Sequence, residues 1–399
     1  MPFSRPNEDR VNRPASNPMA RDTPVLLNTA GEVEAEIKSR RHNLIEGFSM
    51  LMAILVCLWW VAYPFGVLMG VGVADALSRL ALWAGAIFVL LVSPRMHGDT
   101  PESRGLGNPM WVWRALAHGA PLRRLGLALL LGGLTLCLAM FLYANAPDAG
   151  KFLLGLPREI ALAAKLNAGG SVLLFIFCLG VSAFWTVVVI RYDNFISALT
   201  VAGKMLSVLL PVILIFAFLC NGPAPFGAID LRECGLSGVG YIFWGAIQQL
   251  LFCGYFGTRL RKGFAPGDRG NRRVRRLSVA ILNGSFFGLI HINSWSLVVA
   301  TWILGTFLSW AFMEDRARNL FALGIVHGVL GTCTSCFFNG AHGFHIRMRV
   351  GPWWMSEFDP MTAAVSSIVI VGLAVFLYRI ARARSPEDDP SCCAAKSSG

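Results

Sequence analysis

Long apolar stretches separated by short polar segments dominate the chain. Each stretch is close to the length of about 20 residues that an α-helix needs to cross the hydrocarbon core of a bilayer. We count about ten of them, with ends placed to within several residues. They lie at residues 45–66, 74–93, 125–146, 169–190, 205–220, 239–258, 277–293, 295–313, 319–338 and 362–381. The pattern predicts an all-α, polytopic membrane helix bundle.

The two ends of the chain are polar instead. Residues 1–43 are rich in Pro and Arg and lack the apolar core of a signal peptide, which predicts a disordered tail. Residues 383–399 are also predicted to be disordered, and their Cys392 and Cys393 are candidates for palmitoylation. Between the tails we expect N-terminal transmembrane helices, a membrane core, and an outer loop with the last helix, at residues 44–204, 205–340 and 341–382.

Basic residues beside the apolar stretches predict the orientation. Lys38, Arg40 and Arg41 precede the first stretch, and the positive-inside rule then places the N-terminus inside. Alternation puts the C-terminus inside as well, and it puts the densest basic cluster on an inner loop. That cluster contains Arg259, Arg261, Lys262, Arg269, Arg272, Arg273, Arg275 and Arg276. Topology therefore accounts for the net charge of +12, and we expect membrane lipids rather than nucleic acid as partners.

Composition agrees with a membrane protein. The chain is 55% hydrophobic and 15% charged, with a mean hydropathy of +0.57, whereas soluble domains are about 25% charged. This predicts an integral, multi-pass protein, in the cell membrane if the source is bacterial. Most of the ten cysteines lie inside apolar stretches, which argues against a disulfide framework. Cys220 and Cys234 flank a predicted outer loop and are the one candidate pair.

Four polar side chains inside apolar stretches are the strongest functional signal. Gln248 and Gln249 are adjacent in one stretch, and His291 and His327 occur in two others. A buried amide without a hydrogen-bond partner costs roughly 2–7 kcal/mol. Polar side chains at membrane depth therefore face the bundle interior and mark functional sites.

Three short motifs at these positions resemble those of the CAAX-protease and bacteriocin-processing membrane family (CPBP, or Abi). Residues 248–254 (Gln-Gln-Leu-Leu-Phe-Cys-Gly) resemble its Glu-Glu-x-x-x-Arg motif. Residues 287–291 (Phe-Gly-Leu-Ile-His) resemble its Phe-x-x-x-His motif, and residues 327–331 resemble its motif of a His followed four residues later by Asn. The resemblance covers roughly residues 205–340 and is carried by the register of all three motifs.

The resemblance implies an intramembrane endopeptidase that acts on prenylated or leader-peptide substrates and needs no cofactor. In the family, the first Glu is thought to activate a water, and the second Glu, the Arg and the two His to orient it and stabilise the oxyanion. The corresponding positions here, in chain order, are Gln248, Gln249, Cys253, His291, His327 and Gly331. The two histidines match the family, whereas the other four positions depart from it.

These departures weaken the implied chemistry. A general base typically contributes a factor of about 10²–10⁴ in rate, and a carboxamide has no useful basicity. Gln248 is therefore expected to hydrogen-bond a water or carbonyl without deprotonating the water. Gln249 and Cys253 are neighbours on one helix face and replace an ionic pair by two neutral groups. Proteolysis is predicted to be impaired or altered. Because Cys253 and Gly331 are also exchanged, we attribute the Gln pair to natural divergence.

Other functions remain open at this point. The protein could be a catalytically silent relative that serves as a membrane binding or scaffold protein, or a transporter or membrane acyltransferase. Cys253 with a histidine has the residue types of a thiolate–imidazole pair, although buried cysteines are common as small apolar side chains. A weaker candidate is a zinc site, for which the residue types are present in Cys333, Cys336, His342 and His345.

Overall fold

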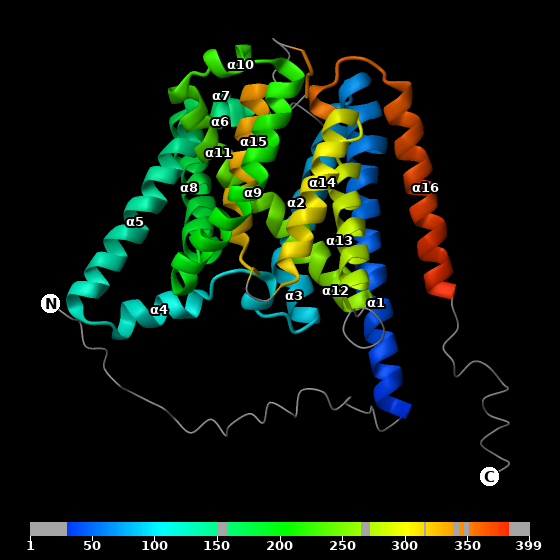
Figure 1. Ribbon diagram of the computed structural model, residues 1–399, viewed down its shortest axis with the longest axis horizontal. Helices are drawn as coiled ribbons and strands as arrows, with labels where there is room; N and C mark the ends of the chain where they lie inside the picture. Colours follow the sequence, from blue (N-terminus) through cyan, green and yellow to red (C-terminus); the bar gives the residue numbers. More distant parts are fainter. Residues whose placement is uncertain are drawn as a thin grey trace.

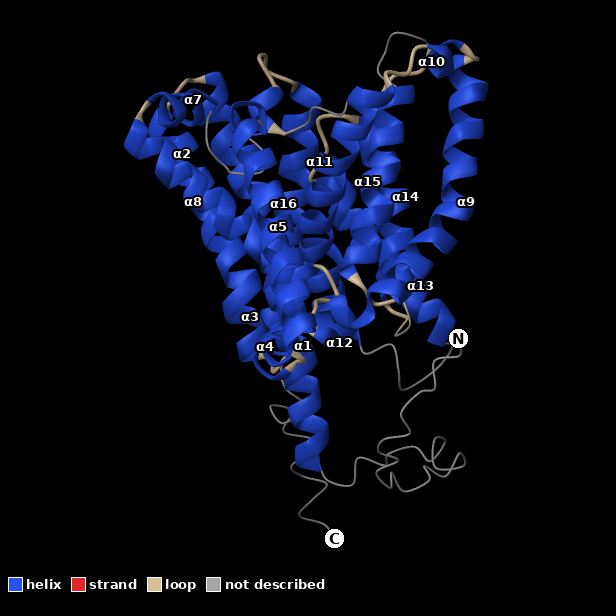
Figure 2. Ribbon diagram, turned by 90° about the vertical axis from the view of Figure 1, so that its left-hand side faces the viewer, coloured by secondary structure: helices blue, strands red, loops and turns tan. Residues whose placement is uncertain are grey.

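In the computed structural model, most of the chain forms a bundle of helices (Figure 1). It describes residues 30–149, 158–264, 272–314, 317–338, 343–346 and 351–382. All regular structure within these ranges is helical (Figure 2). Nine helical segments in these ranges are long and apolar enough to cross a membrane: Lys38–Leu68, Gly72–Met96, Pro121–Ala144, Ala168–Val189, Phe195–Asn221, Cys234–Phe264, Trp295–Phe312, Leu320–Phe337 and Pro360–Arg382. The predicted all-α, multi-pass architecture is therefore confirmed.

Several of these segments join two or more helical elements, four of which are π-helical. The π-helical elements are η2 (Val56–Leu68), η3 (Phe88–Val92), η5 (Trp185–Val189) and η7 (Leu250–Gly257). The α-helices of the first half are α1 (Ala30–Leu55), α2 (Gly72–Ile87), α3 (Ser93–Met96), α4 (Pro109–His118), α5 (Pro121–Ala144), α6 (Ala146–Ala149), α7 (Arg158–Leu166), α8 (Ala168–Phe184) and α9 (Phe195–Asn221). Those of the second half are α10 (Ala224–Gly227), α11 (Leu231–Gln249), α12 (Thr258–Phe264), α13 (Arg272–Leu289), α14 (Trp295–Phe312), α15 (Leu320–Phe337) and α16 (Pro360–Arg382). Three short 3₁₀ turns complete the set: η4 (Glu102–Arg104), η6 (Tyr192–Asn194) and η8 (Pro352–Trp354).

One predicted span, residues 277–293, is not among the nine. It corresponds to α13, which is a helix of 18 residues that starts with Arg272, Arg273, Arg275 and Arg276. These charges lower its apolar character although it packs along α14 inside the bundle. The difference between about ten predicted spans and nine apolar segments therefore lies in the basic first turn of α13.

The basic ends of the helices gather at one end of the bundle. The beginning of α1, the helix α12 and the end of α16 lie at the bottom of Figure 1, whereas α7 and α10 lie at the top. We call the bottom the inner end, as the positive-inside bias requires. Helix α1 begins at Ala30, so it starts within the range that was predicted to be a tail. Residues 1–29 and the C-terminal tail with Cys392 and Cys393 lie outside the described residues.

Helices α11 and α15 form a close central pair because glycines remove the side chains between them. A Cβ atom added to Gly324 would lie 2.7 Å from the Cβ atom of Ala246. A Cβ atom added to Gly328 would lie 2.4 Å from the Cα atom of Ile242. Gly324 and Gly328 form a Gly-x-x-x-Gly pattern, which allows membrane helices to approach backbone to backbone. The pair holds Gln249 on one helix beside His327 on the other.

A disulfide between Cys234 and Cys336 joins the outer ends of this pair. The candidate pair of Cys220 and Cys234, which nothing in the sequence required, is therefore not formed, and Cys220 is a free thiol at the end of α9. The physical reason is that the start of α11 packs against the end of α15. Sequence proximity across the outer loop did not reveal that packing.

The N-terminal cap of α8 provides a test of local stability at the outer surface. The Oδ1 atom of Asn167 accepts hydrogen bonds from the backbone N–H groups of Gly169 (3.0 Å) and Gly170 (3.3 Å). Replacing Asn167 by alanine is expected to lower the free energy of unfolding by about 1 kcal/mol, because two backbone donors lose their acceptor. Titration with sodium dodecyl sulfate in mixed micelles measures this change. The matched variant Asn167→Asp keeps an acceptor and should stay close to the original, and equal losses in both variants would contradict the capping role.

Candidate functional site

The site begins at Gln249, the last residue of α11 before the helix widens into the π-helical η7. Its side chain is fully buried. The Nε2 atom donates a hydrogen bond to Nδ1 of His327 (2.9 Å), and Oε1 accepts one from the Sγ–H group of Cys253 (2.9 Å). Because Nδ1 of His327 is the acceptor, the neutral imidazole carries its proton on Nε2. The Gln249 amide is thus engaged at both ends by neutral partners.

This hydrogen-bonded chain continues across two further helices. The Sγ atom of Cys253 lies 4.0 Å from Oγ of Ser309 on α14. That hydroxyl accepts a hydrogen bond from Nδ2 of Asn283 on α13 (2.7 Å), which also donates to the carbonyl of Phe252 (3.0 Å). Hydrogen bonds of this kind stabilise neutral polar groups in hydrocarbon, although Oδ1 of Asn283 is buried without a hydrogen-bond partner among the described residues. Ser309 and Asn283 were not predicted, although each is a polar residue in an apolar run, the signal that identified the Gln pair.

His291 and His327 share one aromatic wall. His291 follows the end of α13, and its Nδ1–H group donates to the carbonyl of Phe287 (2.9 Å). The Phe287 ring lies between the two imidazoles, with centroid distances of 5.3 Å to His291 and 5.6 Å to His327. Both histidines are buried. Their shared contact with Phe287 places the second and third motifs side by side.

Gln248 and Gly331 lie beside this network without joining it. Gln248 is half-buried, and its amide makes no hydrogen bond to the described residues. Gly331 faces Tyr241, because a Cβ atom added to it would lie 3.1 Å from Cδ1 of that ring. The place of a longer side chain at position 331 is therefore taken by an aromatic ring. Of the six predicted positions, the structure links Gln249, Cys253 and His327 by hydrogen bonds and brings His291 close to them.

A second polar cluster lies at the inner end of the bundle, where Arg259 is 1% exposed. Its Nη1 atom donates to Oδ1 of Asn43 (2.7 Å), and its Nη2 atom is paired with Asp99. Its Nε atom lies 3.5 Å from Oε1 of Glu46. Lys262 also bonds to Asp99, at 2.5 Å. The two carboxylates thus face two cations at the inner end.

The acid Glu46 makes two further contacts in this cluster. Its Oε1 atom accepts a hydrogen bond from Oγ of Ser93 (2.5 Å), and its Oε2 atom lies 2.6 Å from Nε2 of His97. The nearby Arg104 is also buried, and loss of hydration lowers its pKa to about 10, so that it remains cationic at neutral pH. Sequence reasoning missed this cluster, although Glu46 is a lone acid in the first apolar stretch.

The weak zinc candidate among the cysteines has one of its four residues committed to a disulfide. Cys336 is bonded to Cys234 and has no thiolate to offer a metal. Cys333 is a free thiol on α15, and Nδ1 of His345 bonds to the carbonyl of Phe338 at 3.2 Å. His342 lies outside the described residues. The spacing of the four residues did not reveal that one of them is committed to a disulfide.

Comparison with protein families gives one match. Residues 233–333 match the family model described as "Type II CAAX prenyl endopeptidase Rce1-like". The matched segment contains all three motifs and every residue of the hydrogen-bonded network. No curated protein and no solved structure matches the chain. The match confirms the resemblance over a narrower range than residues 205–340, and it leaves the N-terminal helices without a counterpart.

Proposed function

We propose that residues 233–333 form a CAAX-endopeptidase-like site that binds a prenylated or leader-type peptide in the membrane and lacks an efficient cleavage step. The match to the type II CAAX prenyl endopeptidase model supports the peptide-binding part. The observation that carries the rest is the Gln249 amide, which is used at both ends by His327 and Cys253. This proposal is favoured over a transporter or an acyltransferase because the match covers every residue of the site.

The residue types and hydrogen-bond directions leave few groups in the site that can deprotonate a water. A general base needs a lone pair that faces a water and a conjugate acid of suitable pKa. Gln248 and Gln249 are amides, and the Nδ1 lone pair of His327 already accepts from Gln249. His291 donates through Nδ1, so its Nε2 lone pair is the one imidazole acceptor in the site that these bonds leave available. We therefore expect no measurable hydrolysis, and His291 is the base to test if the unmodified chain does cleave a peptide.

Cys253 does not act as a catalytic nucleophile in place of an activated water. Its side chain is 1% exposed, and its thiol proton is directed at Oε1 of Gln249. A nucleophilic cysteine must reach the substrate as a thiolate, which an adjacent base normally generates. Here the neighbouring groups are a neutral amide and the hydroxyl of Ser309. We infer that Cys253 is a structural hydrogen-bond donor.

Cleavage and binding should be measured together in proteoliposomes. The substrates are a prenylated CAAX peptide and a leader peptide, each carrying a photoreactive group. The unmodified chain is expected to crosslink one of these peptides and to release no more product than His291→Ala. The double variant Gln248→Glu/Gln249→Glu is expected to gain cleavage, by as much as the factor of about 10²–10⁴ that a general base supplies. A carboxylate at position 249 can accept from Cys253 and from His327 once that imidazole moves its proton to Nδ1.

Two results would contradict the proposal. Cleavage by the unmodified chain that disappears in His291→Ala would show an active peptidase with a base other than glutamate. Absence of both crosslinking and cleavage with either substrate would remove the peptide-binding function. Crosslinking without cleavage in every variant would support binding, and would place the remaining block at Cys253 or at the Tyr241 ring that faces Gly331.

A further inference from the structure

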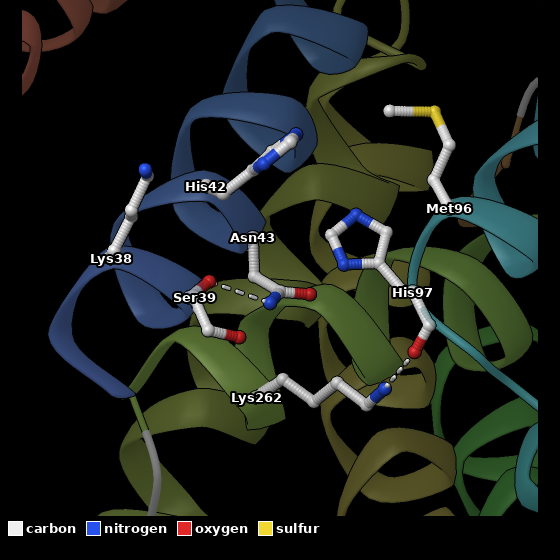
Figure 3. Close-up of a pocket in the computed structure, with 7 residues that line it drawn as sticks. All are labelled: Lys38, Ser39, His42, Asn43, Met96, His97 and Lys262. Atoms are coloured by element: carbon white, nitrogen blue, oxygen red, sulfur yellow. Dashed lines mark hydrogen bonds between the residues drawn. The ribbon is translucent and has the colours of Figure 1, made fainter. Parts of the chain in front are cut away.

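A pocket of about 390 Å³ is lined by residues of α1, of the segment around α3 and of α12 (Figure 3). These elements lie at the inner end of the bundle (Figure 1). His42 enters it from α1, and His97 enters it from the residue that follows α3. The two imidazole rings approach edge to face, with centroids 5.1 Å apart. Lys262 of α12 also lines the pocket. Two histidines from separate elements therefore meet at the same opening.

We propose that His42, Glu46 and His97 form a binding site for one divalent transition-metal ion of the zinc type. One ligand atom from each of the three side chains lies within 4.8 Å of the other two. A zinc ion with bonds of about 2.0–2.2 Å holds its ligand atoms within about 4 Å of one another, so small rotations of the side chains complete the geometry. His42 and Glu46 are four residues apart and share one face of α1.

The carboxylate is already held for this role. The Oε2 atom of Glu46 lies 2.6 Å from Nε2 of His97, so the two groups are hydrogen-bonded in the metal-free protein. A bound metal ion would replace this hydrogen bond, with the two side chains moving slightly apart to act as ligands. The Oε1 atom keeps its hydrogen bond from Ser93 (2.5 Å), the kind of outer contact that orients metal-bound carboxylates.

The net charge around the three ligands does not itself favour a cation. Arg259 and Lys262 share the single carboxylate of Asp99, Arg259 also lies 3.5 Å from Glu46, and Lys38 lines the pocket. Metal binding therefore rests on the three ligand atoms. Two imidazoles and one carboxylate are the donor set of zinc sites that retain an open position, and two of the three donors, His42 and His97, line the pocket. The site would also link α1 to the segment after α3, and it does not depend on the function proposed for the Gln249 network.

Metal binding can be measured on the full chain purified in detergent without a polyhistidine tag. After equilibrium dialysis against Zn²⁺ or Co²⁺, metal analysis is expected to find one equivalent, with visible Co²⁺ absorption bands of a four- or five-coordinate site. His42→Ala/His97→Ala should lose this equivalent. The matched control His118→Ala/His345→Ala removes two histidines elsewhere and should retain it. Ser93→Ala is expected to weaken binding about 10- to 100-fold without changing the stoichiometry.

A stability measurement separates loss of the site from loss of the fold. Zn²⁺ is expected to raise the unfolding midpoint of the original chain and of the His118/His345 control. The milder variant His42→Asn/His97→Gln should show the metal-free midpoint and no such rise. Absence of a saturable equivalent in the original chain, or equal binding in both double variants, would overturn the proposal. Binding of phosphatidylglycerol at the pocket in nanodiscs that Zn²⁺ does not displace would overturn it as well.

Discussion

Replacing Arg259 by alanine is expected to lower the free energy of unfolding by about 3–5 kcal/mol, because it leaves buried carboxylates without their cation. The guanidinium is 1% exposed and is paired with Asp99, whose side chain is also 1% exposed. It donates to Asn43 as well and lies 3.5 Å from Glu46. Lys262 contacts Asp99 from a half-exposed position, so it can compensate only part of the loss.

The measurement is a sodium dodecyl sulfate titration in mixed micelles, with two comparison variants. Arg259→Lys keeps the charge and loses the planar fork that reaches several acceptors, and it should fall between the original and the alanine variant. Arg382→Ala removes an exposed arginine at the end of α16 and should change stability by less than about 0.5 kcal/mol. A loss below about 1 kcal/mol for Arg259→Ala would show that the inner cluster reorganises around other partners.

Gly328→Ala is expected to destabilise the protein by about 3 kcal/mol, the upper end of the usual cost of overpacking. The new methyl group would lie 2.4 Å from the Cα atom of Ile242, which is backbone and has no rotamer to change. Helices α11 and α15 must then separate. The hydrogen bond between Gln249 and His327, at 2.9 Å, lies within this pair and should lengthen with it.

A glycine in open surroundings gives the matched control. Gly180 on α8 has no atom within 4 Å of the added Cβ position. Gly180→Ala should therefore be neutral or stabilise by up to about 1 kcal/mol, because alanine is the better helix former. Opposite signs for the two substitutions in the same titration would establish the close helix contact. Equal effects at Gly328 and Gly180 would contradict it.

The bundle and the central polar positions were predictable because each rests on local chemistry. Apolar runs of membrane length predict helices, and amides or imidazoles inside them predict a buried site. Gln249, Cys253 and His327 are indeed hydrogen-bonded together in the structure. The extension of this network to Ser309 and Asn283 was not predictable. It depends on how α13 and α14 align with α11, and the sequence does not reveal that alignment.

Features that depend on pairing between distant helices were not predictable. Cys234 pairs with Cys336 because the ends of α11 and α15 coincide, whereas the nearer Cys220 suggested another partner. The ring of Tyr241 faces Gly331 for the same reason. The inner cluster joins the first apolar helix to a segment about 50 positions later through side-chain contacts of Glu46 with Ser93 and His97, which the sequence does not reveal.

The basic first turn of α13 has a consequence for the lipid around the protein. Residues 277–289, which follow it, extend about 20 Å at 1.5 Å per residue, against about 30 Å of hydrocarbon in an ordinary bilayer. Leu277 and Ile281 are exposed on this short helix. A membrane accommodates so short an apolar segment by thinning or by flanking side chains that extend to the interface, and the arginines of the first turn can extend in this way. We expect acyl-chain length to act on this side of the bundle, because thicker membranes increase the mismatch at a modest cost per ångström.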